Sequence, residues 1–575
     1  MQDKIKNLIQ DALKNLDIEV STITVEHPGD SSMGDYSTNL ALAIAKNIGE
    51  NPKALAEKIV TEIRRLNTFP EIEKIDVAGP GFINFYLSRK FFTDATEEIL
   101  NAGKKVGTNE ILKDQKIMIE YTDPNPFKPF HIGHLMTNAI GESVARILEH
   151  SGAEVSRANY QGDVGLHVAK AIYGLLKDES LQDMTVSHGE QAANIGKAYV
   201  MGAGAYENDP IAKEEIDEIN KKIYDKTDEH INEIYAWGFE ATMKAFEDLY
   251  AILGTKFDFY FLESNVAIPG REMVRDNLGE IFEESDGAVV FKGEKFNEEG
   301  KLKLHTRVFM TSKGLPTYEA KELGLALEKF TANPSMVESI TVTANEQKDY
   351  MRIVYKALSL IHPEYESKMK HITHGMMRLS GGKMSSRMGN VVTGESLIRD
   401  TIALVREKME DREWEEGDKN AVAEVVGVAA IKYSILRQST GGDIIYDFDT
   451  SISFEGDSGP YLQYSYARAN SVLEKAQKEN ILPDFEHVPE KTFEVEKFLY
   501  RFPEIVKRAA SEYEPHYIAN YLIEIARAFN SFYGNTVIVH QEDKASSYKV
   551  ALTYAFSFVM KTGLHLLGIK ALAKM

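Results

Sequence analysis

The order of patterns between residues 116 and 159 restricts the possible fold more than any other feature of the chain. An apolar run at 116–121 is typical of a buried parallel strand, and a proline-rich loop follows it. A helix is then expected from about His134 to Ser151, with Gly152 in the place of a helix-ending glycine. A second strand is expected at 154–159. Strand, loop, helix and strand in this order predict a nucleotide-binding α/β fold.

The length of 575 residues leaves room for about three to four domains around this unit. Residues 1–108 are expected to form a small α+β domain. Its helices precede two strands at 74–77 and 82–87, and the sequence Gly-Pro-Gly at 79–81 is typical of a tight turn between them. A linker near 101–110 ends this domain.

Residues 109–450 are predicted to form the nucleotide-binding domain. It carries an acidic, helical insertion at about 176–250, and strand patterns resume at 288–291 and 339–343. Residues 451–575 are mostly helical and are predicted to form a bundle.

The composition excludes several classes of protein. Cysteine is absent, which removes disulfides, cysteine nucleophiles and cysteine-ligated zinc or iron–sulfur clusters. No apolar run approaches the roughly 20 residues that a membrane helix needs, and the charged, amphipathic stretch 1–16 is unlike a signal peptide. The net charge of −22 disfavours binding of polyanions through bulk charge but permits local basic patches. A cytoplasmic enzyme or assembly protein is therefore expected.

The loop after the first strand carries the first group of candidate functional residues. Three prolines between 123 and 130 are expected to hold it extended. His131 and His134 then share one face of a helix start, where exposed amides attract phosphate and imidazoles can donate to a developing negative charge. Gly133 leaves room for a flat base or ribose. The alternatives are a zinc site, for which no third ligand follows at metal spacing, and two structural histidines in a helix cap.

A basic, glycine-containing segment far downstream forms the second group. Between 367 and 390 there are five Lys or Arg residues and no Asp or Glu. Lys383 and Arg387 can contact phosphate oxygens as a point charge and as a planar fork, while Ser385 and Ser386 add hydroxyl donors. The alternative, a basic loop without function, loses weight because the first group lies on a nucleotide-binding pattern.

Together, His-Ile-Gly-His at 131–134 and Lys-Met-Ser-Ser-Arg at 383–387 resemble the two signatures of class I aminoacyl-tRNA synthetases. The usual second signature is Lys-Met-Ser-Lys-Ser, from which Ser386 and Arg387 depart. The chain looks specifically like the arginyl-tRNA synthetase family over nearly its whole length. The stretches that carry this likeness are Gly-Asp-Tyr-Ser-Thr-Asn at 34–39, Val-Ala-Gly-Pro-Gly-Phe-Ile-Asn at 77–84, Ser-Phe-Glu-Gly-Asp-Ser-Gly-Pro-Tyr-Leu-Gln-Tyr at 453–464 and Leu-Leu-Gly-Ile at 566–569.

The resemblance implies a fold and an activity. The fold would be a Rossmann-like, HUP-type catalytic core between an N-terminal α+β domain and a C-terminal helical bundle that binds the anticodon. The activity would join L-arginine to tRNA(Arg) through an arginyl-adenylate, with release of AMP and pyrophosphate. The expected partners are ATP accompanied by Mg²⁺, L-arginine and tRNA(Arg). Protein-bound zinc and a membrane are not expected, and the chain would act as a monomer in the cytoplasm.

The resemblance also assigns roles to individual residues. Lys128 is thought to replace the missing signature lysine. The implied catalytic residues are His131, His134, Lys128, Lys383 and Arg387. The implied ATP-binding residues are His131, Gly133, His134, Lys383, Met384, Ser385 and Ser386. The implied arginine-binding residues are Glu120, Asp123, Asn125, His134, Tyr318, Glu322 and Gln347.

Three positions in this group depart from the family pattern. Glu322 stands where Asp is usual, Asp123 where Ser or Ala is common, and Tyr350 where His is common. A guanidinium requires a carboxylate, so Glu322 keeps the charge but changes the expected depth of the pocket.

The tRNA is expected to contact both ends of the chain. Residues 544–575 carry five Lys and no acidic residue, and the aromatic residues Phe529, Phe532 and Tyr533 lie just upstream. Splayed bases stack on such rings, although each ring could equally belong to a helix core.

The sequence leaves three functional alternatives open: a nucleotidyltransferase with a His-x-Gly-His motif, another class I synthetase, and an inactive relative that only binds tRNA.

Overall fold

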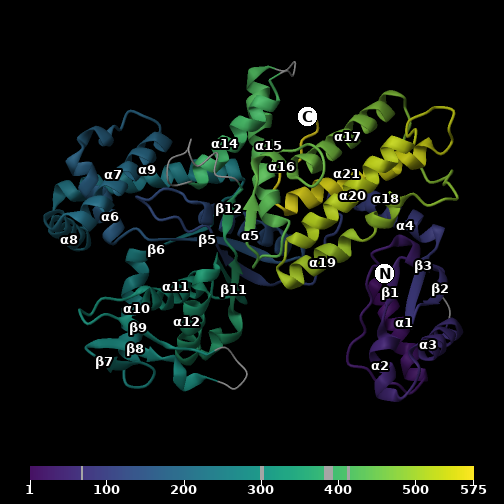
Figure 1. The fold of residues 1–575 in the computed structure, drawn as a ribbon, viewed down its shortest axis with the longest axis horizontal. Helices are drawn as coiled ribbons and strands as arrows, with labels where there is room; N and C mark the ends of the chain where they lie inside the picture. The colour runs from purple at the N-terminus through teal and green to yellow at the C-terminus, as the bar shows by residue number, and fades with distance from the viewer. Residues whose placement is uncertain (67–68, 298–302, 381–392, 411–414) are drawn as a thin grey trace.

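The computed structural model describes residues 1–66, 69–297, 303–380, 393–410 and 415–575. Figure 1 shows an N-terminal unit beside a helical C-terminal bundle, and a central sheet with further lobes on the opposite side of the molecule. Within the described ranges, no helix is both long enough and apolar enough to cross a lipid bilayer.

The N-terminal unit is an antiparallel sheet covered by helices. The predicted hairpin is present, and a third strand, which the sequence patterns did not reveal, pairs with its second strand to give the order β1-β3-β2. Alternating residues of the central strand β3 pack against the helices in a core of their own. The elements are α1 (Gln2–Asn15), β1 (Tyr36–Thr38), α2 (Leu40–Ile48), α3 (Pro52–Leu66), β2 (Ile72–Ala78), β3 (Phe82–Leu87) and α4 (Arg89–Ala102).

A five-stranded parallel sheet forms the centre of the molecule, in the order β11-β10-β4-β5-β6. The predicted strand at 116–121 is its middle strand, and helix α5 connects it to β5 as expected. Because the chain builds outward from β4 on one side and later returns to its other side, the strand order reverses between β4 and β10. The elements are β4 (Lys116–Glu120), α5 (Ile132–His150), β5 (Glu154–Gln161), α6 (Leu166–Lys177), β6 (Phe259–Leu262), β10 (Glu338–Ala344), α12 (Lys348–Ile361) and β11 (Met369–His374).

Two lobes are inserted between the strands of this sheet (Figure 1). One is helical and follows α6, in the stretch where the acidic charge pattern indicates helices. The other contains a three-stranded antiparallel sheet between two helices. The elements are α7 (His188–Asn208), α8 (Pro210–Asp225), α9 (Glu229–Leu253), α10 (Glu263–Asp276), β7 (Glu283–Ser285), β8 (Ala288–Lys292), β9 (Thr306–Met310) and α11 (Tyr318–Ala332).

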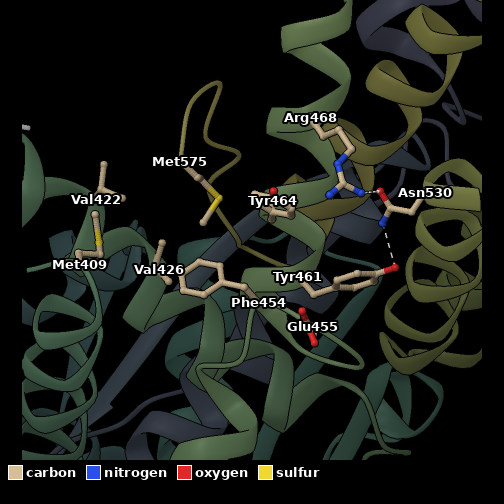
Figure 2. Close-up of a pocket in the computed structure, with 10 residues that line it drawn as sticks. All are labelled: Met409, Val422, Val426, Phe454, Glu455, Tyr461, Tyr464, Arg468, Asn530 and Met575. Atoms are coloured by element: carbon tan, nitrogen blue, oxygen red, sulfur yellow. Dashed lines mark hydrogen bonds between the residues drawn. The ribbon is translucent and has the colours of Figure 1, made fainter. Parts of the chain in front are cut away.

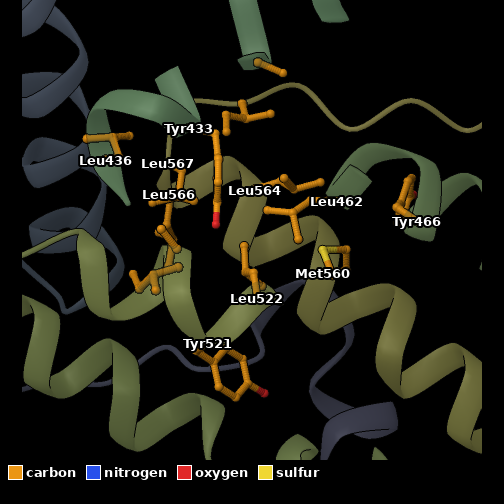
Figure 3. Packing of buried hydrophobic residues seen from close by; sticks show 14 of the residues in the cluster. Tyr433, Leu436, Leu462, Tyr466, Tyr521, Leu522, Met560, Leu564, Leu566 and Leu567 are labelled. Carbon is orange, nitrogen blue, oxygen red and sulfur yellow. The ribbon is translucent and has the colours of Figure 1, made fainter. Parts of the chain in front are cut away.

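The C-terminal bundle packs directly onto the central sheet domain. Apolar side chains from α5 and from the last helices belong to one continuous buried cluster, part of which Figure 3 shows around Leu522 and Leu566. The two long amphipathic helices of the bundle are α20 and α21. The elements between the central sheet and the bundle are β12 (Met377–Leu379), α14 (Gly394–Lys408), α15 (Glu416–Leu436), β13 (Ile444–Tyr446) and α16 (Phe448–Ser451). Those of the bundle are α17 (Gly459–Lys478), α18 (Glu494–Leu499), α19 (Phe502–Glu512), α20 (His516–Asn535) and α21 (Ser546–Leu566).

Polar contacts attach the N-terminal unit to the bundle. Glu504 of α19 accepts hydrogen bonds from the Tyr36 hydroxyl at 2.7 Å and from the Gln2 amide at 3.0 Å, and it contacts Nε2 of His27 at 3.2 Å. These bonds hold the pKa of Glu504 at about 2 although burial alone would raise it. The ionised Glu504 carboxylate is thus one of the contacts that join the two ends of the chain, together with the ion pair of Arg89 with Glu496.

Candidate active site

A cavity of about 440 Å³ opens at the carboxyl ends of β4, β10 and β11. This is the point where the strand order reverses, which is where open α/β sheets bind ligands. The residues from the sequence analysis that line it are Glu120, Asp123, His131, Gly133, His134, Tyr318, Glu322 and Gln347. The structure thus gathers around one space the two expected phosphate-binding histidines and the expected arginine-binding residues except Asn125, which does not line the cavity.

The two histidines cap helix α5, and their hydrogen bonds determine which nitrogen of each ring carries the hydrogen atom. Nδ1 of His131 accepts from the His134 amide at 3.4 Å, and Nδ1 of His134 accepts from the His131 amide at 3.2 Å. Because each Nδ1 accepts, a neutral ring carries its hydrogen on Nε2, which is then free to donate to a ligand. Burial lowers the pKa of both rings, and the charge of Lys128 lowers them further.

Glycine at position 133 is required by this histidine pair. A Cβ atom there would lie 2.9 Å from Cε1 of His131. The imidazoles of His131 and His134 stack with ring centroids 3.4 Å apart, and a side chain at Gly133 would disturb that arrangement. Gly133 itself still lines the cavity, next to the His131 ring.

The loop between β4 and α5 is not the uniformly extended segment expected from its prolines. Thr122, Asp123 and Phe127 have positive φ angles of 80°, 46° and 65°. Such angles are costly for side chains of these types and persist only where other contacts enforce them. Here Thr122 accepts a hydrogen bond from Asn138 at 3.0 Å, and Asp123 accepts one from the Tyr160 amide at 2.7 Å.

Asn125 and Lys128 belong to the same loop. Asn125 Oδ1 accepts a hydrogen bond from the Gly162 amide at 2.9 Å, so its oxygen is used by the fold and its NH₂ group remains the donor. Lys128 is half-buried, with its ammonium 5.6 Å from the centroid of the Tyr199 ring. Burial lowers the pKa of Lys128, and the neighbouring charge of Lys170 lowers it further.

Glu120 already has a partner that the sequence analysis missed. Lys329 of α11 forms an ion pair with it, and both side chains are almost completely buried. Lys329 also contacts the Thr341 hydroxyl at 3.4 Å. Tyr318, Glu322 and Lys329 follow one another at four and seven residues, and this helical spacing could have revealed that they share a face of α11.

Glu322 faces the cavity with its carboxylate bonded to a tyrosine. The Tyr350 hydroxyl donates to Oε1 of Glu322 at 3.0 Å. Burial and the nearby charge of Glu120 raise the pKa of Glu322 to about 7. Tyr318, at the first position of α11, is 67% exposed, and Gln347 directly precedes α12, with no hydrogen bond from its side chain to the helix end. The cavity therefore has a carboxylate-rich floor and a more open aromatic edge.

The second candidate group, from Lys383 to Arg387, lies outside the described residues, together with the rest of 381–392. Both flanks are described. The Ser380 amide donates to the Tyr446 carbonyl at 2.9 Å, and Thr393 forms a β-bridge with His131. The chain after this segment therefore returns to the first histidine of the cavity.

A second cavity, of about 420 Å³, lies in the C-terminal part (Figure 2). Figure 2 shows Tyr461, Tyr464 and Arg468 of α17 on one side of it. The Arg468 guanidinium lies 4.9 Å from the Tyr464 ring centroid and 5.0 Å from that of Tyr533, and it donates to Asn530 at 2.5 Å.

This arrangement corrects the aromatic cluster expected upstream of residue 544. Phe529 and Phe532 are buried, and Phe529 stacks on Phe556 at 3.9 Å, so both belong to the bundle core. Tyr533 is 44% exposed and is the member of the three that reaches the surface. Tyr461, Tyr464 and Arg468 line the nearby cavity.

The fold and cavity define a class I aminoacyl-tRNA synthetase. Residues 95–448 match the family described as tRNA synthetases class I (R), catalytic domain. The flanking parts match two further families, the arginyl tRNA synthetase N terminal domain at 3–87 and the DALR anticodon binding domain at 462–575.

The chain belongs to the arginine–tRNA ligase family. It is 31% identical to the arginine–tRNA ligase of Halothermothrix orenii, over 100% of this chain and 99% of the relative. It is 32% identical to that of Fusobacterium nucleatum, over 100% and 98%. The Thermus thermophilus arginyl-tRNA synthetase shares its fold with a TM-score of 0.81 at 24% identity, over the full length of both chains. The protein is thus an ATP-binding enzyme that attaches arginine to tRNA(Arg) in protein synthesis.

Proposed function

We propose that the cavity at the carboxyl edge of the central sheet is where arginine is activated. The carboxylate of L-arginine attacks the α-phosphorus of ATP, which gives arginyl-adenylate and pyrophosphate. The 2′-hydroxyl of the terminal tRNA adenosine then takes the arginyl group and releases AMP. Such transfers need positioning and charge neutralisation rather than a protein nucleophile.

The histidine pair supports this proposal most strongly. His131 and His134 present Nε2–H donors beside the start of α5, where free amides also favour an anion. Lys128 adds a positive charge next to both rings. We assign ATP binding to His131, Gly133 and His134, and phosphate neutralisation to Lys128. From the second group we assign Lys383, Met384, Ser385, Ser386 and Arg387 to ATP, with Lys383 and Arg387 as catalytic residues.

We assign the arginine side chain to the face of α11. Glu322 supplies the carboxylate for the guanidinium, and Tyr318 lies one turn earlier on the same face. Glu120 contributes to the field of the pocket while paired with Lys329. The amino and carboxylate groups of the substrate are assigned to Asp123, Asn125, His134 and Gln347.

We assign the tRNA to both ends of the chain, with domains at 1–108, 109–450 and 451–575 and the helical insertion at about 176–250. Most apolar residues of the N-terminal part form a cluster that also includes Tyr500, while Ile99 and Val106 belong to the large cluster that spans the other two parts. The proposed boundary near 450 therefore separates functions and does not coincide with a boundary between cores. In the C-terminal part, the cavity beside Tyr464 and Arg468 offers aromatic rings and a guanidinium to a splayed anticodon base.

We further propose that Mg²⁺ enters with ATP and that the chain acts as a monomer in the cytoplasm. Mg²⁺ is commonly held by substrate phosphates with few protein ligands. Sedimentation with and without tRNA tests the oligomeric state.

The assignment of the histidine pair is tested with His131→Asn in arginine-dependent ATP–pyrophosphate exchange at saturating tRNA(Arg). Asparagine is a favoured helix cap, so α5 keeps its N-terminal hydrogen bond while the Nε2 donor is lost. We expect the exchange rate to fall on the order of 10²-fold, with KM for arginine nearly unchanged. A full exchange rate in this variant would remove His131 from the reaction.

A further inference from the structure

Tyr350 has a contact that none of the roles above uses. It lies at the start of α12, three residues after Gln347, and lines the same cavity. Its hydroxyl donates to Oε1 of Glu322 at 3.0 Å. The guanidinium of Arg307 also lies 6.0 Å from the centroid of the Tyr350 ring. The side chain therefore connects α12 to the carboxylate on α11.

A hydrogen bond such as that from Tyr350 prepares the Glu322 carboxylate to bind a guanidinium. A guanidinium is bound best when two parallel N–H groups meet two oxygens in one plane. Each carboxylate oxygen has two lone pairs, so the Tyr350 hydroxyl can hold Oε1 of Glu322 and still leave the outer edge of the carboxylate free. Long side chains lose rotamer freedom when they bind, and a carboxylate that is already fixed loses less.

The charges around Glu322 give Tyr350 a second role, which concerns the ionisation of the carboxylate. Glu120 at the end of β4 and Glu263 on α10 disfavour its ionised form, while Lys329 and the Tyr350 hydroxyl favour it. A guanidinium requires the ionised form. The hydroxyl of Tyr350 thus orients the carboxylate and also helps to keep it charged.

We infer that Tyr350 is a positioning residue for arginine recognition, which acts by fixing the Glu322 carboxylate in the plane that a guanidinium needs. The inference rests on the proposed role of Glu322 in the arginine subsite. It assigns Tyr350 no contact with the reacting atoms, so its loss should weaken the binding of arginine and leave the chemical step and ATP binding unchanged.

The test is Tyr350→Phe in arginine-dependent ATP–pyrophosphate exchange at saturating tRNA(Arg). One hydrogen bond to a charged group is lost, so KM for arginine should rise about 10-fold, with kcat and KM for ATP within about twofold of the unchanged enzyme. Inhibition by butylguanidine, which contains only the guanidinium end of the substrate, should weaken by the same factor. Tyr365→Phe, which removes the hydroxyl of a half-buried tyrosine just after α12 and outside the cavity lining, is the control and should change none of these values.

Two further variants separate the possible failures. Tyr350→His restores a hydrogen-bond donor and should recover part of the arginine affinity. Glu322→Gln should raise KM for arginine by far more than Tyr350→Phe does; if it changes nothing, the proposed arginine subsite is wrong. If Glu322→Gln has its effect but Tyr350→Phe does not, the inference about Tyr350 alone is overturned. A uniform loss of kcat and of both affinities in Tyr350→Phe would also overturn it, since that result describes a general structural role.

Discussion

Lys329 and Glu120 form an ion pair beneath the cavity, with 2% and 3% of their side chains exposed. Removing one member of such a pair leaves a buried charge without a partner, which is far more damaging than replacing both. The pair also neutralises one of the carboxylates around the cavity, so that Glu322 is left to match the single charge of a guanidinium.

We therefore predict that Lys329→Met lowers the free energy of unfolding by about 3 kcal/mol. Urea denaturation, followed through the first transition, measures this change. The double variant Lys329→Met with Glu120→Gln should be more stable than the single one, because it contains no unpaired buried charge. A single variant as stable as the unchanged protein would show that Glu120 is neutral in the folded state.

The binding of arginine should depend on pH through Glu322. Its folded pKa of about 7 lies above the usual value for a carboxyl, so the protonated form is favoured at low pH. Protonation removes the charge that a guanidinium requires. We predict that kcat/KM for arginine rises with pH through about 7 and then levels off. KM for ATP should not change over this pH range. The pH-dependent rise of kcat/KM for arginine should be missing in Glu322→Gln. If the rise persists in this variant, another group produces it.

The second signature can be tested although its residues lie outside the described ranges. Lys383→Ala removes a positive charge assigned to the phosphates. We expect the adenylation rate to fall on the order of 10²–10³-fold with tRNA affinity nearly intact. Pre-steady-state adenylate formation and a filter-binding assay with tRNA measure the two quantities. An unchanged rate of adenylate formation would exclude the assigned role.

The central fold could be predicted from the sequence because its signals are local. The strand at 116–121, the helix after it and the strand at 154–159 all have clear periodicity and clear ends, and they appear in the structure as β4, α5 and β5. The third strand of the N-terminal sheet, β1 (Tyr36–Thr38), was missed because it has only three residues. Its existence depends on pairing with β3, which no local pattern reveals.

The candidate site was only partly predictable for the same reason. Tyr318 and Glu322 are related by helical spacing, but the pairing of Lys329 with Glu120 joins residues 209 positions apart in sequence numbering and follows from the position of α11 over the sheet. Likewise, Phe529 and Phe532 have the composition of a base-stacking surface, and only the packing of α20 against α21 places them in the core. Where the local pattern was ambiguous, tertiary contacts therefore determine whether a residue lies in the core, in an ion pair or at the surface.

Recognition of tRNA by the C-terminal cavity leads to a separate prediction. Deleting 451–575 would also remove apolar cover from the catalytic domain, because both belong to one buried cluster, so a point variant is the better test. A stacked base contributes about 1–3 kcal/mol, and Tyr464→Ala should therefore raise KM for tRNA(Arg) about 10- to 100-fold. KM values for arginine and ATP in the exchange reaction should not change. Tyr554→Ala, on α21, offers a comparison at a half-buried tyrosine that does not belong to the cavity lining. Equal effects of the two variants would argue against a base-binding role.

The attachment of the N-terminal unit to the bundle should depend on Glu504. Its folded pKa of about 2 lies below the usual 4.5, so the ionised form contributes stability that is present above pH 4.5 and is lost as the pH falls toward 2. We predict that Glu504→Gln lowers the stability of this interface by on the order of 2–3 kcal/mol at pH 7, because His27 and Tyr36 lose a charged acceptor. Unfolding measured at several pH values should show the difference between the two proteins shrink between pH 4.5 and 2. A difference that stays constant over this range would mean that the contact is not sustained by the charge of Glu504. Glu512→Gln, at an exposed carboxylate of the same helix that bonds Arg508, is the control and should change stability by less than about 1 kcal/mol.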